Sequence, residues 1–151
     1  MKLGGVLLLI VMLVSCAAPE KTSLMVKQFV LRDQVHDAAE DPMVRMEKLR
    51  HLHGAVSMEE RSKRLGQYYS LVWNDPDGVG SGEIVALFEY QQGDSRIRRM
   101  TREFPADSSH GVAEFAVVGN DYVENGRVLA WRASIRRGDR EIASRQSYLW
   151  Q

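Results

Sequence analysis

Apolar and polar residues alternate with a period of two through most of the chain after residue 66, which is typical of β-strands with one buried face. The clearest run is 128–136, where Leu, Trp, Ala and Ile alternate with Arg132, Ser134 and Arg136. Comparable runs occupy 67–74, 84–90, 113–117 and 141–150. Residues 96–104 alternate poorly and carry charges on both faces, so we expect them at a sheet edge.

The segment before residue 66 has a mixed pattern. Residues 24–31 are apolar on both sides, which predicts a strand buried on both faces. Asp41-Pro42 supplies a cap followed by proline at the first helical position, and Gly54 supplies a stop, so a helix is predicted from 42 to about 53. Residues 57–60 have the spacing of a capping box and predict a second short helix. The stripe of the first helix expected to face the core contains Met43, Met46, Leu49 and His53.

Turn residues separate these runs at close intervals. They include Asp75-Pro76-Asp77-Gly78, Asn125-Gly126 and Gly138-Asp139. Together the runs and turns predict a mainly β fold, an immunoglobulin-like β-sandwich of about seven strands. One or two short helices are expected between its first and second strands.

The N-terminal 16 residues differ in character from the rest. Met1-Lys2 is followed by an apolar run, 3–14, that is shorter than the roughly 20 residues a membrane-spanning helix needs. The run ends in Leu13-Val14-Ser15-Cys16, which resembles the lipobox of bacterial lipoprotein precursors. The resemblance implies that lipid is attached to Cys16 and that a signal peptide, 1–15, is cut off between Ser15 and Cys16.

The same resemblance implies where the chain acts. Residues 16–22 would be a lipidated N-terminus and short tether, and residues 23–151 a single β-rich domain. Six residues, 17–22, reach about 20 Å at most, so the domain is expected close to the membrane of the cell envelope. Ala17 and Ala18 follow the cysteine, a pattern that among lipoproteins favours the outer membrane in a host with two membranes. In a host with one membrane, the outer face of the cell membrane is expected.

Composition limits the chemistry of the domain. Cys16 is the only cysteine of the chain, which excludes disulfides, thiolate metal sites and cysteine nucleophiles from residues 23–151. The 20 basic and 20 acidic residues balance, which gives no electrostatic reason to expect a nucleic-acid partner. We expect that the protein binds neither a cofactor nor nucleic acid, and that lipid on Cys16 attaches it to a membrane.

The four histidines do not predict a metal or catalytic site. His51 and His53 are two residues apart on a predicted helix, so their side chains point about 200° apart and cannot share a metal. We expect His53 on the apolar stripe and His51 in solvent. His36 and His110 fall in loop-like segments without a carboxylate or hydroxyl at a telling spacing.

The strongest local charge cluster consists of Arg96, Arg98, Arg99 and Arg102. Such a cluster could bind phosphate headgroups or an acidic polymer. Charges on an edge strand also prevent sheet-to-sheet aggregation, and alternation sends these arginines to opposite faces. Edge protection is therefore the preferred interpretation.

Two short motifs have simpler interpretations than their functional ones. Asp75, Asp77 and Gly80 match three positions of a calcium loop, but Val79 and Ala86 stand where ligands are needed, which favours a hairpin loop. Residues 137–139 spell Arg-Gly-Asp, the tripeptide that integrins bind, at a place where a two-residue turn is required. We prefer the turn.

The sequence favours a non-enzymatic module that binds an envelope protein or a cell-wall polymer near the membrane. One alternative is a small hydrolase or carbohydrate-active enzyme, which would need two acids in one cleft. Another is an accessory subunit of an envelope complex, which an exposed apolar patch would indicate. The acids available on predicted strands are Glu83, Glu89, Glu103 and Glu114.

Overall fold

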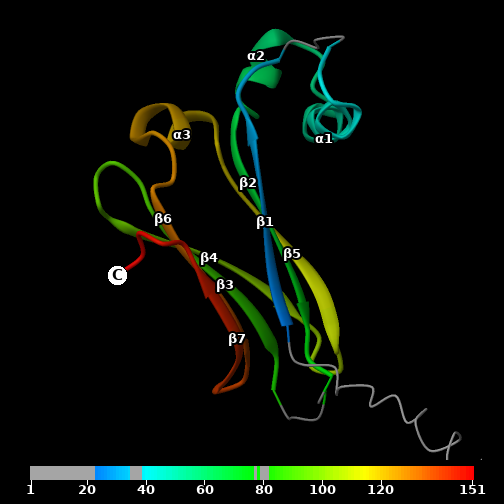
Figure 1. Cartoon of the computed structure of the whole chain (residues 1–151), viewed down its shortest axis with the longest axis vertical. Helices are drawn as coiled ribbons and strands as arrows, with labels where there is room; N and C mark the ends of the chain where they lie inside the picture. Colours follow the sequence, from blue (N-terminus) through cyan, green and yellow to red (C-terminus); the bar gives the residue numbers. More distant parts are fainter. Residues whose placement is uncertain (1–22, 35–38, 77, 79–81) are drawn as a thin grey trace, which may run out of the picture.

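The computed structural model describes residues 23–34, 39–76, 78 and 82–151. In this part of the chain, seven strands form two antiparallel sheets, accompanied by three short helices (Figure 1). The mainly β sandwich with two helices between its first and second strands is confirmed. The strands are β1 (Ser23–Leu31), β2 (Gly66–Asn74), β3 (Ile84–Gln91), β4 (Ile97–Phe104), β5 (His110–Val118), β6 (Ala130–Arg137) and β7 (Arg140–Gln146). The helices are α1 (Pro42–Leu52), α2 (Met58–Ser62) and α3 (Gly119–Asn125).

The strand order is β1-β2-β5 in one sheet and β4-β3-β6-β7 in the other. β4 pairs with β3. In a constant-type immunoglobulin domain the fourth strand instead joins the sheet of the first two, so the present arrangement differs from that type in one strand. β4 is an edge strand, as its charge pattern predicted.

The core lies between the two sheets and consists of the alternate residues that the period of two predicted. Phe88 of β3 is at its centre, with its ring centroid 4.5 Å from that of Tyr69 and 5.5 Å from that of Phe115. Fully buried neighbours along these strands and β6 are Leu71, Ile84, Ala86, Ala113, Ala133 and Ile135. Their burial is the main source of stability, because each large apolar side chain removed from water contributes about 1.5–3 kcal/mol.

β1 is not buried on both faces, which corrects the prediction for residues 24–31. It pairs only with β2, at the edge of its sheet. Leu24 packs into the core, while Met25 on the other face is exposed. The outer face meets another element near Phe29, whose ring lies 5.3 Å from that of His51 on α1. An apolar outer face thus remains partly open to solvent.

The two helices after β1 begin at the predicted caps. The Asp41 carboxylate accepts a hydrogen bond from the Met43 backbone N–H at 2.8 Å. Ser57 and Glu60 form the predicted capping box at the start of α2, with the Ser57 hydroxyl accepting from the Glu60 N–H at 3.1 Å. Both local predictions are confirmed.

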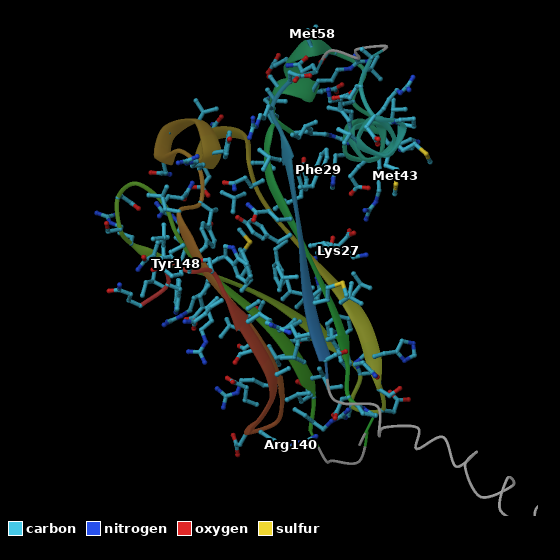
Figure 2. All side chains as sticks on the ribbon, in the orientation of Figure 1. Lys27, Phe29, Met43, Met58, Arg140 and Tyr148 are labelled. Atoms are coloured by element: carbon cyan, nitrogen blue, oxygen red, sulfur yellow. The ribbon has the colours of Figure 1, made fainter. Side chains whose placement is uncertain are left out.

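α1 packs against the domain through the side opposite to the predicted one. Its buried residues are Lys48 and Leu52. Lys48 can be buried because its ammonium group donates to Asp33 at 2.8 Å and lies 2.9 Å from Glu40, and these carboxylates raise its pKa. The predicted core stripe is instead exposed, with Met43 at 80%, Met46 at 71% and Leu49 at 50%. Figure 2 places Met43 and Met58 at the same end of the molecule.

Two predicted boundaries in the second half are wrong. Asn125-Gly126 is not a hairpin turn but the end of α3, where Gly126 has a φ of 79° and donates to the Tyr122 carbonyl. The last strand ends at Gln146 rather than near residue 150. Beyond it, Tyr148 is 98% exposed.

Candidate functional site

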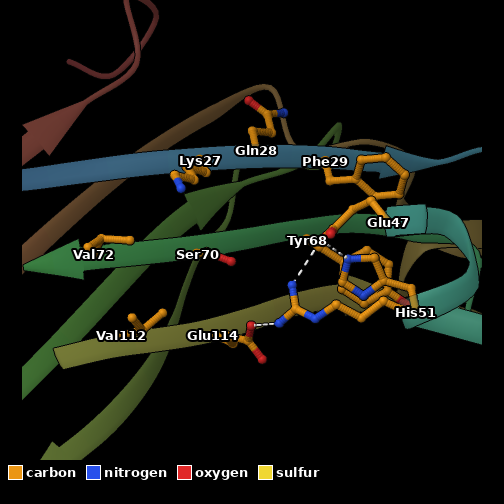
Figure 3. A pocket seen from close by; sticks show the side chains of 11 residues that line it. Lys27, Gln28, Phe29, Glu47, His51, Tyr68, Ser70, Val72, Val112 and Glu114 are labelled. Carbon is orange, nitrogen blue, oxygen red and sulfur yellow. Dashed lines mark hydrogen bonds and ion pairs between the residues drawn. The ribbon is translucent and has the colours of Figure 1, made fainter. Parts of the chain in front are cut away.

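An open groove of about 410 Å³ lies on the outer face of the β1-β2-β5 sheet, beside α1 (Figure 3). The three strands form its floor and α1 forms the wall at one end. We call it the sheet groove. It is lined by Lys27, Gln28, Phe29, Glu47, Arg50, His51, Tyr68, Ser70, Val72, Val112 and Glu114.

His51 closes the helical end of the sheet groove. Its imidazole lies between two aromatic rings, with centroids 3.7 Å from Tyr68 and 5.3 Å from Phe29. The Tyr68 hydroxyl donates to the Arg64 carbonyl at 2.6 Å, which fixes the orientation of that ring. The stack attaches α1 to β1 and β2, and it reverses the predicted roles of the histidines, because His53 is exposed.

This end of the groove carries no net charge on its rings at neutral pH. Burial lowers the pKa of His51 below its usual 6.5, although the Glu47 carboxylate 3.1 Å from Nε2 acts in the opposite direction. Burial also raises the pKa of Tyr68. The imidazole is therefore neutral and the phenol protonated, so this end presents an aromatic, weakly polar surface.

The middle of the groove is spanned by an ion-pair bridge. Arg50 of α1 donates to Glu47 at 3.0 Å and, on the floor, to Glu114 of β5. Two carboxylates thus share one guanidinium. Because Arg50 engages both acids of the groove, the bridge suits recognition of polar groups better than the hydrolase alternative, which needs two acids facing a substrate.

The other end of the groove is open. Val72 and Val112 form an apolar floor there, and Val112 is exposed. Within the described residues, no hydrogen bond or ion pair engages the Lys27 ammonium group, which lies in the row of Ser70 and Glu114 next to these valines (Figure 3). This end offers a cation beside apolar surface.

The predicted arginine cluster does not form one surface. Arg98 makes two hydrogen bonds of 2.9 Å to Asp94 and thereby lowers the pKa of that carboxyl to about 2. Arg99 points to the other face of β4, where it donates to Glu89 at 2.7 Å. Arg96 lies 3.9 Å from Asp94. Arg102 lines an adjoining hollow of about 370 Å³, which shares Arg50 and Glu114 among other residues with the sheet groove.

The residues of the calcium-like loop and of the Arg-Gly-Asp tripeptide form one buried ion pair. The carboxylate of Asp75 is fully buried and accepts from Arg137 Nε at 3.1 Å. Asp75 is thus engaged by arginine, and Asp77 and Gly80 lie outside the described residues. Because the Arg137 side chain is buried, it is not available to a receptor. Gly138 has a φ of 52° and begins the predicted turn.

The remaining histidines and acids are dispersed. His110 lies 3.2 Å from the Ser109 hydroxyl, and His36 is outside the described residues. In the part of the chain that is described, no three His, Cys, Asp or Glu side chains lie close enough to hold a metal ion. Glu83, Glu89 and Glu103 do not line the sheet groove; of the four predicted acids, only Glu114 does.

Apart from Glu114 and His51, the sequence did not single out the residues that line the groove. Alternation does place Lys27 and Phe29 on one face of β1, and Tyr68 and Ser70 on one face of β2. The register of the sheet brings these pairs together, because Lys27 is opposite Ser70 and Phe29 opposite Tyr68. The position of α1 over them depends on long-range packing that no local pattern shows.

The predicted lipidation site, Cys16, and the cleavage position after Ser15 lie outside the described residues. None of the helices in the described part is long and apolar enough to cross a membrane. Comparison of the chain with known protein families, with curated proteins and with solved structures finds no match.

Proposed function

We propose that this chain is a lipid-anchored, non-enzymatic binding module of the bacterial envelope that holds a protein partner in the sheet groove. The observation that carries the proposal is the open groove next to the exposed apolar side of α1, formed by Met43, Met46 and Leu49. Exposed apolar side chains that cluster beside a polar groove are typical of protein interaction sites.

A protein partner fits this surface better than a cell-wall glycan. Sugars stack on exposed aromatic faces, but His51 covers one face of both Phe29 and Tyr68. The groove instead joins an aromatic end, an ion-pair bridge and a cation beside valines. The flexible thioethers of Met43 and Met46 adapt to the shape of another protein's side chains.

The path of β1 supports a proposed arrangement of anchor and binding surface at opposite ends of the sheet. Ser23 pairs with Asn74 at one end of the sheet, and Leu31 pairs with Gly66 at the other, where α1 and α2 lie (Figure 1). Nine extended residues span about 30 Å. A lipid on Cys16 would hold the Ser23 end near the bilayer and present α1 away from it.

Site-specific crosslinking in cells tests the proposal. A photoreactive benzoylphenylalanine is placed at residue 46 or 112 around the groove, and at residue 136 on the outer face of the other sheet as the control. We expect the same protein to be crosslinked from positions 46 and 112, and not from 136. Leu49→Asp should abolish capture from position 112 while leaving the melting temperature unchanged, because Leu49 is half exposed.

Equal crosslinking from position 136, or crosslinks from 112 that survive Leu49→Asp, would exclude the groove as the binding surface. If the captured protein is part of a larger assembly, its identity also shows which envelope complex the chain serves.

A further inference from the structure

A second cavity, of about 560 Å³, lies on the other side of β1, where the segment joining α3 to β6 faces the upper half of that strand (Figure 1). We call it the arginine cavity. Its volume is within the range of about 300–1,000 Å³ that is usual for small-molecule sites. It is lined by Gln28, Val30, Arg32, Gln67, Tyr122, Arg127, Val128, Leu129 and Leu149.

The arginine cavity is partly open, and its lining combines polar side chains with four apolar ones. Val30 and Val128 lie inside, and Leu129 and Leu149 remain 44% and 61% exposed at its mouth. Leu149 belongs to the C-terminal segment after β7, so this segment contributes an apolar side chain to the cavity. These residues give an apolar ligand a surface on which to pack.

The inner polar groups of the cavity already have partners. Gln67 accepts a hydrogen bond from the Val128 N–H at 2.6 Å. The side-chain amides of Gln28 and Gln67 both donate to the Tyr69 hydroxyl at 3.3 Å. The glutamine side chains at the bottom of the cavity therefore do not need hydrogen bonds from a polar ligand group.

The charged groups of the cavity, unlike its glutamines, have no hydrogen-bond partners among the described residues. Arg32 and Arg127 both line it, and no Asp or Glu does. Within the described residues, neither guanidinium takes part in a hydrogen bond or ion pair. Other arginines of the domain, such as Arg50, Arg98 and Arg137, have carboxylate partners. Two guanidinium groups that no described residue engages, beside the apolar side chains of Leu129 and Leu149, are suited to an anionic head group on an apolar chain.

We propose that the arginine cavity binds an anionic amphiphile, with its carboxylate or phosphate head at Arg32 and Arg127 and its alkyl chain against Leu129 and Leu149. The site is independent of the sheet groove, because the two cavities share only Gln28 among their lining residues. Either source of the head, a fatty acid or a phosphate monoester, satisfies the same two arginines.

Photoaffinity labelling of the full-length protein in phosphatidylcholine nanodiscs tests this inference. The probes are a diazirine-bearing fatty acid, the matching alkyl phosphate and the matching neutral alcohol. We expect both anionic probes to label the peptides that contain residues 127–129 or 149. The probe that labels these peptides more strongly identifies the preferred head group, carboxylate or phosphate. Inorganic phosphate should not displace either probe, because it lacks the alkyl chain.

Variants separate head recognition from chain packing. The double change Arg32→Ala and Arg127→Ala should reduce labelling about tenfold or more, since each guanidinium contributes charge-assisted hydrogen bonds. Arg136→Ala, which removes one positive charge from the outer face of β6, should leave it unchanged. Leu149→Ser should weaken labelling by both anions without lowering the melting temperature. Equal labelling by the alcohol, displacement by inorganic phosphate, or insensitivity to the double variant would overturn the proposal.

Discussion

Asp75 joins three segments of the chain through one buried carboxylate. It follows β2, accepts hydrogen bonds from Arg137 and Arg140 at 3.1 Å each, and its own N–H donates to the Ser109 carbonyl. Arg137 in turn donates to the Ser108 carbonyl at 2.8 Å. The end of β2, the β6–β7 turn and the loop before β5 are held together by these contacts. Such a buried charge is tolerated because its partner is close and well oriented.

Removing the Asp75 carboxylate should therefore destabilise the domain strongly. We expect Asp75→Ala to lower the free energy of unfolding by about 3–5 kcal/mol, because the buried Arg137 guanidinium loses its counter-charge. Arg140→Ala, at the half-exposed partner, should cost about 1 kcal/mol or less. Urea denaturation measures both values. Similar small losses for the two variants would show that the pair is not a main support of this end of the sandwich.

His51 should make the stability of the domain depend on pH. Because burial lowers its pKa in the folded state, the unfolded chain binds a proton more readily once the pH falls below 6.5. The stability that the neutral His51 contributes is fully present above pH 6.5. It is lost as the pH falls from 6.5 towards the lowered pKa of His51 in the folded state. We expect His51→Phe to reduce the loss of stability between about pH 7.5 and 5.5 in chemical denaturation. The exposed neighbour is the control, and an equal effect of His53→Phe would contradict the assignment.

The sequence placed these two histidines on the wrong sides of α1 for a physical reason. A hydrophobic pattern assumes that the most apolar side of a helix faces the core. Here Lys48 is buried instead, because Asp33 and Glu40 neutralise it from the segment before the helix. That neutralisation depends on tertiary contacts, so the sequence could predict the existence and caps of α1 but not the side that packs.

Among the elements, β2 and β3 were predictable, and the edge strands were less so. β6 departs from its predicted alternation, because Ser134, expected on the polar side, is buried. β2 and β3 alternate strictly, and their inward residues are those expected. β1 carries apolar residues on both faces because its outer face forms part of the sheet groove, and this was mistaken for complete burial. β7 ends at Gln146, and the next residue, Ser147, accepts a hydrogen bond from the Trp131 N–H through its hydroxyl at 2.9 Å, a side-chain contact that alternation does not show.

The C-terminal segment after β7 should contribute little to stability. Tyr148 is 98% exposed and Leu149 is 61% exposed. We expect deletion of residues 148–151 to lower the free energy of unfolding by about 1 kcal/mol or less, as for other exposed positions. Thermal melting of the shortened and full chains measures the change. A shift of more than about 8 °C would mean that this segment packs more closely than its exposure indicates.

For the whole molecule, the two sheets account for the fold and the N-terminal segment for the proposed location. The core was predictable because it follows the period of two, and the sheet groove was not, because it arises where a helix from one part of the chain lies over three strands from others. The proposed anchor is a separate prediction that rests on the 16 N-terminal residues.

Lipidation at Cys16 is a prediction that one substitution tests. We expect radiolabelled palmitate to be incorporated into the wild-type chain and to be absent from Cys16→Ser, because the thiol is the point of attachment. Thr22→Ser, a change in the same segment that keeps the cysteine, is the matched control and should be labelled normally. Palmitate that remains on Cys16→Ser would end the lipoprotein assignment.

The antiparallel pairing of β1 with β2 has a mechanical consequence. If the Ser23 end is tethered to a membrane and a partner pulls at the opposite end of the sheet, the load runs along the strand axis. All nine residues of β1 are paired with β2, and their hydrogen bonds lie across that axis, so the load shears them together instead of peeling them one at a time. A tethered domain that is loaded in this direction resists mechanical unfolding better than a domain whose first strand is pulled sideways from the sheet.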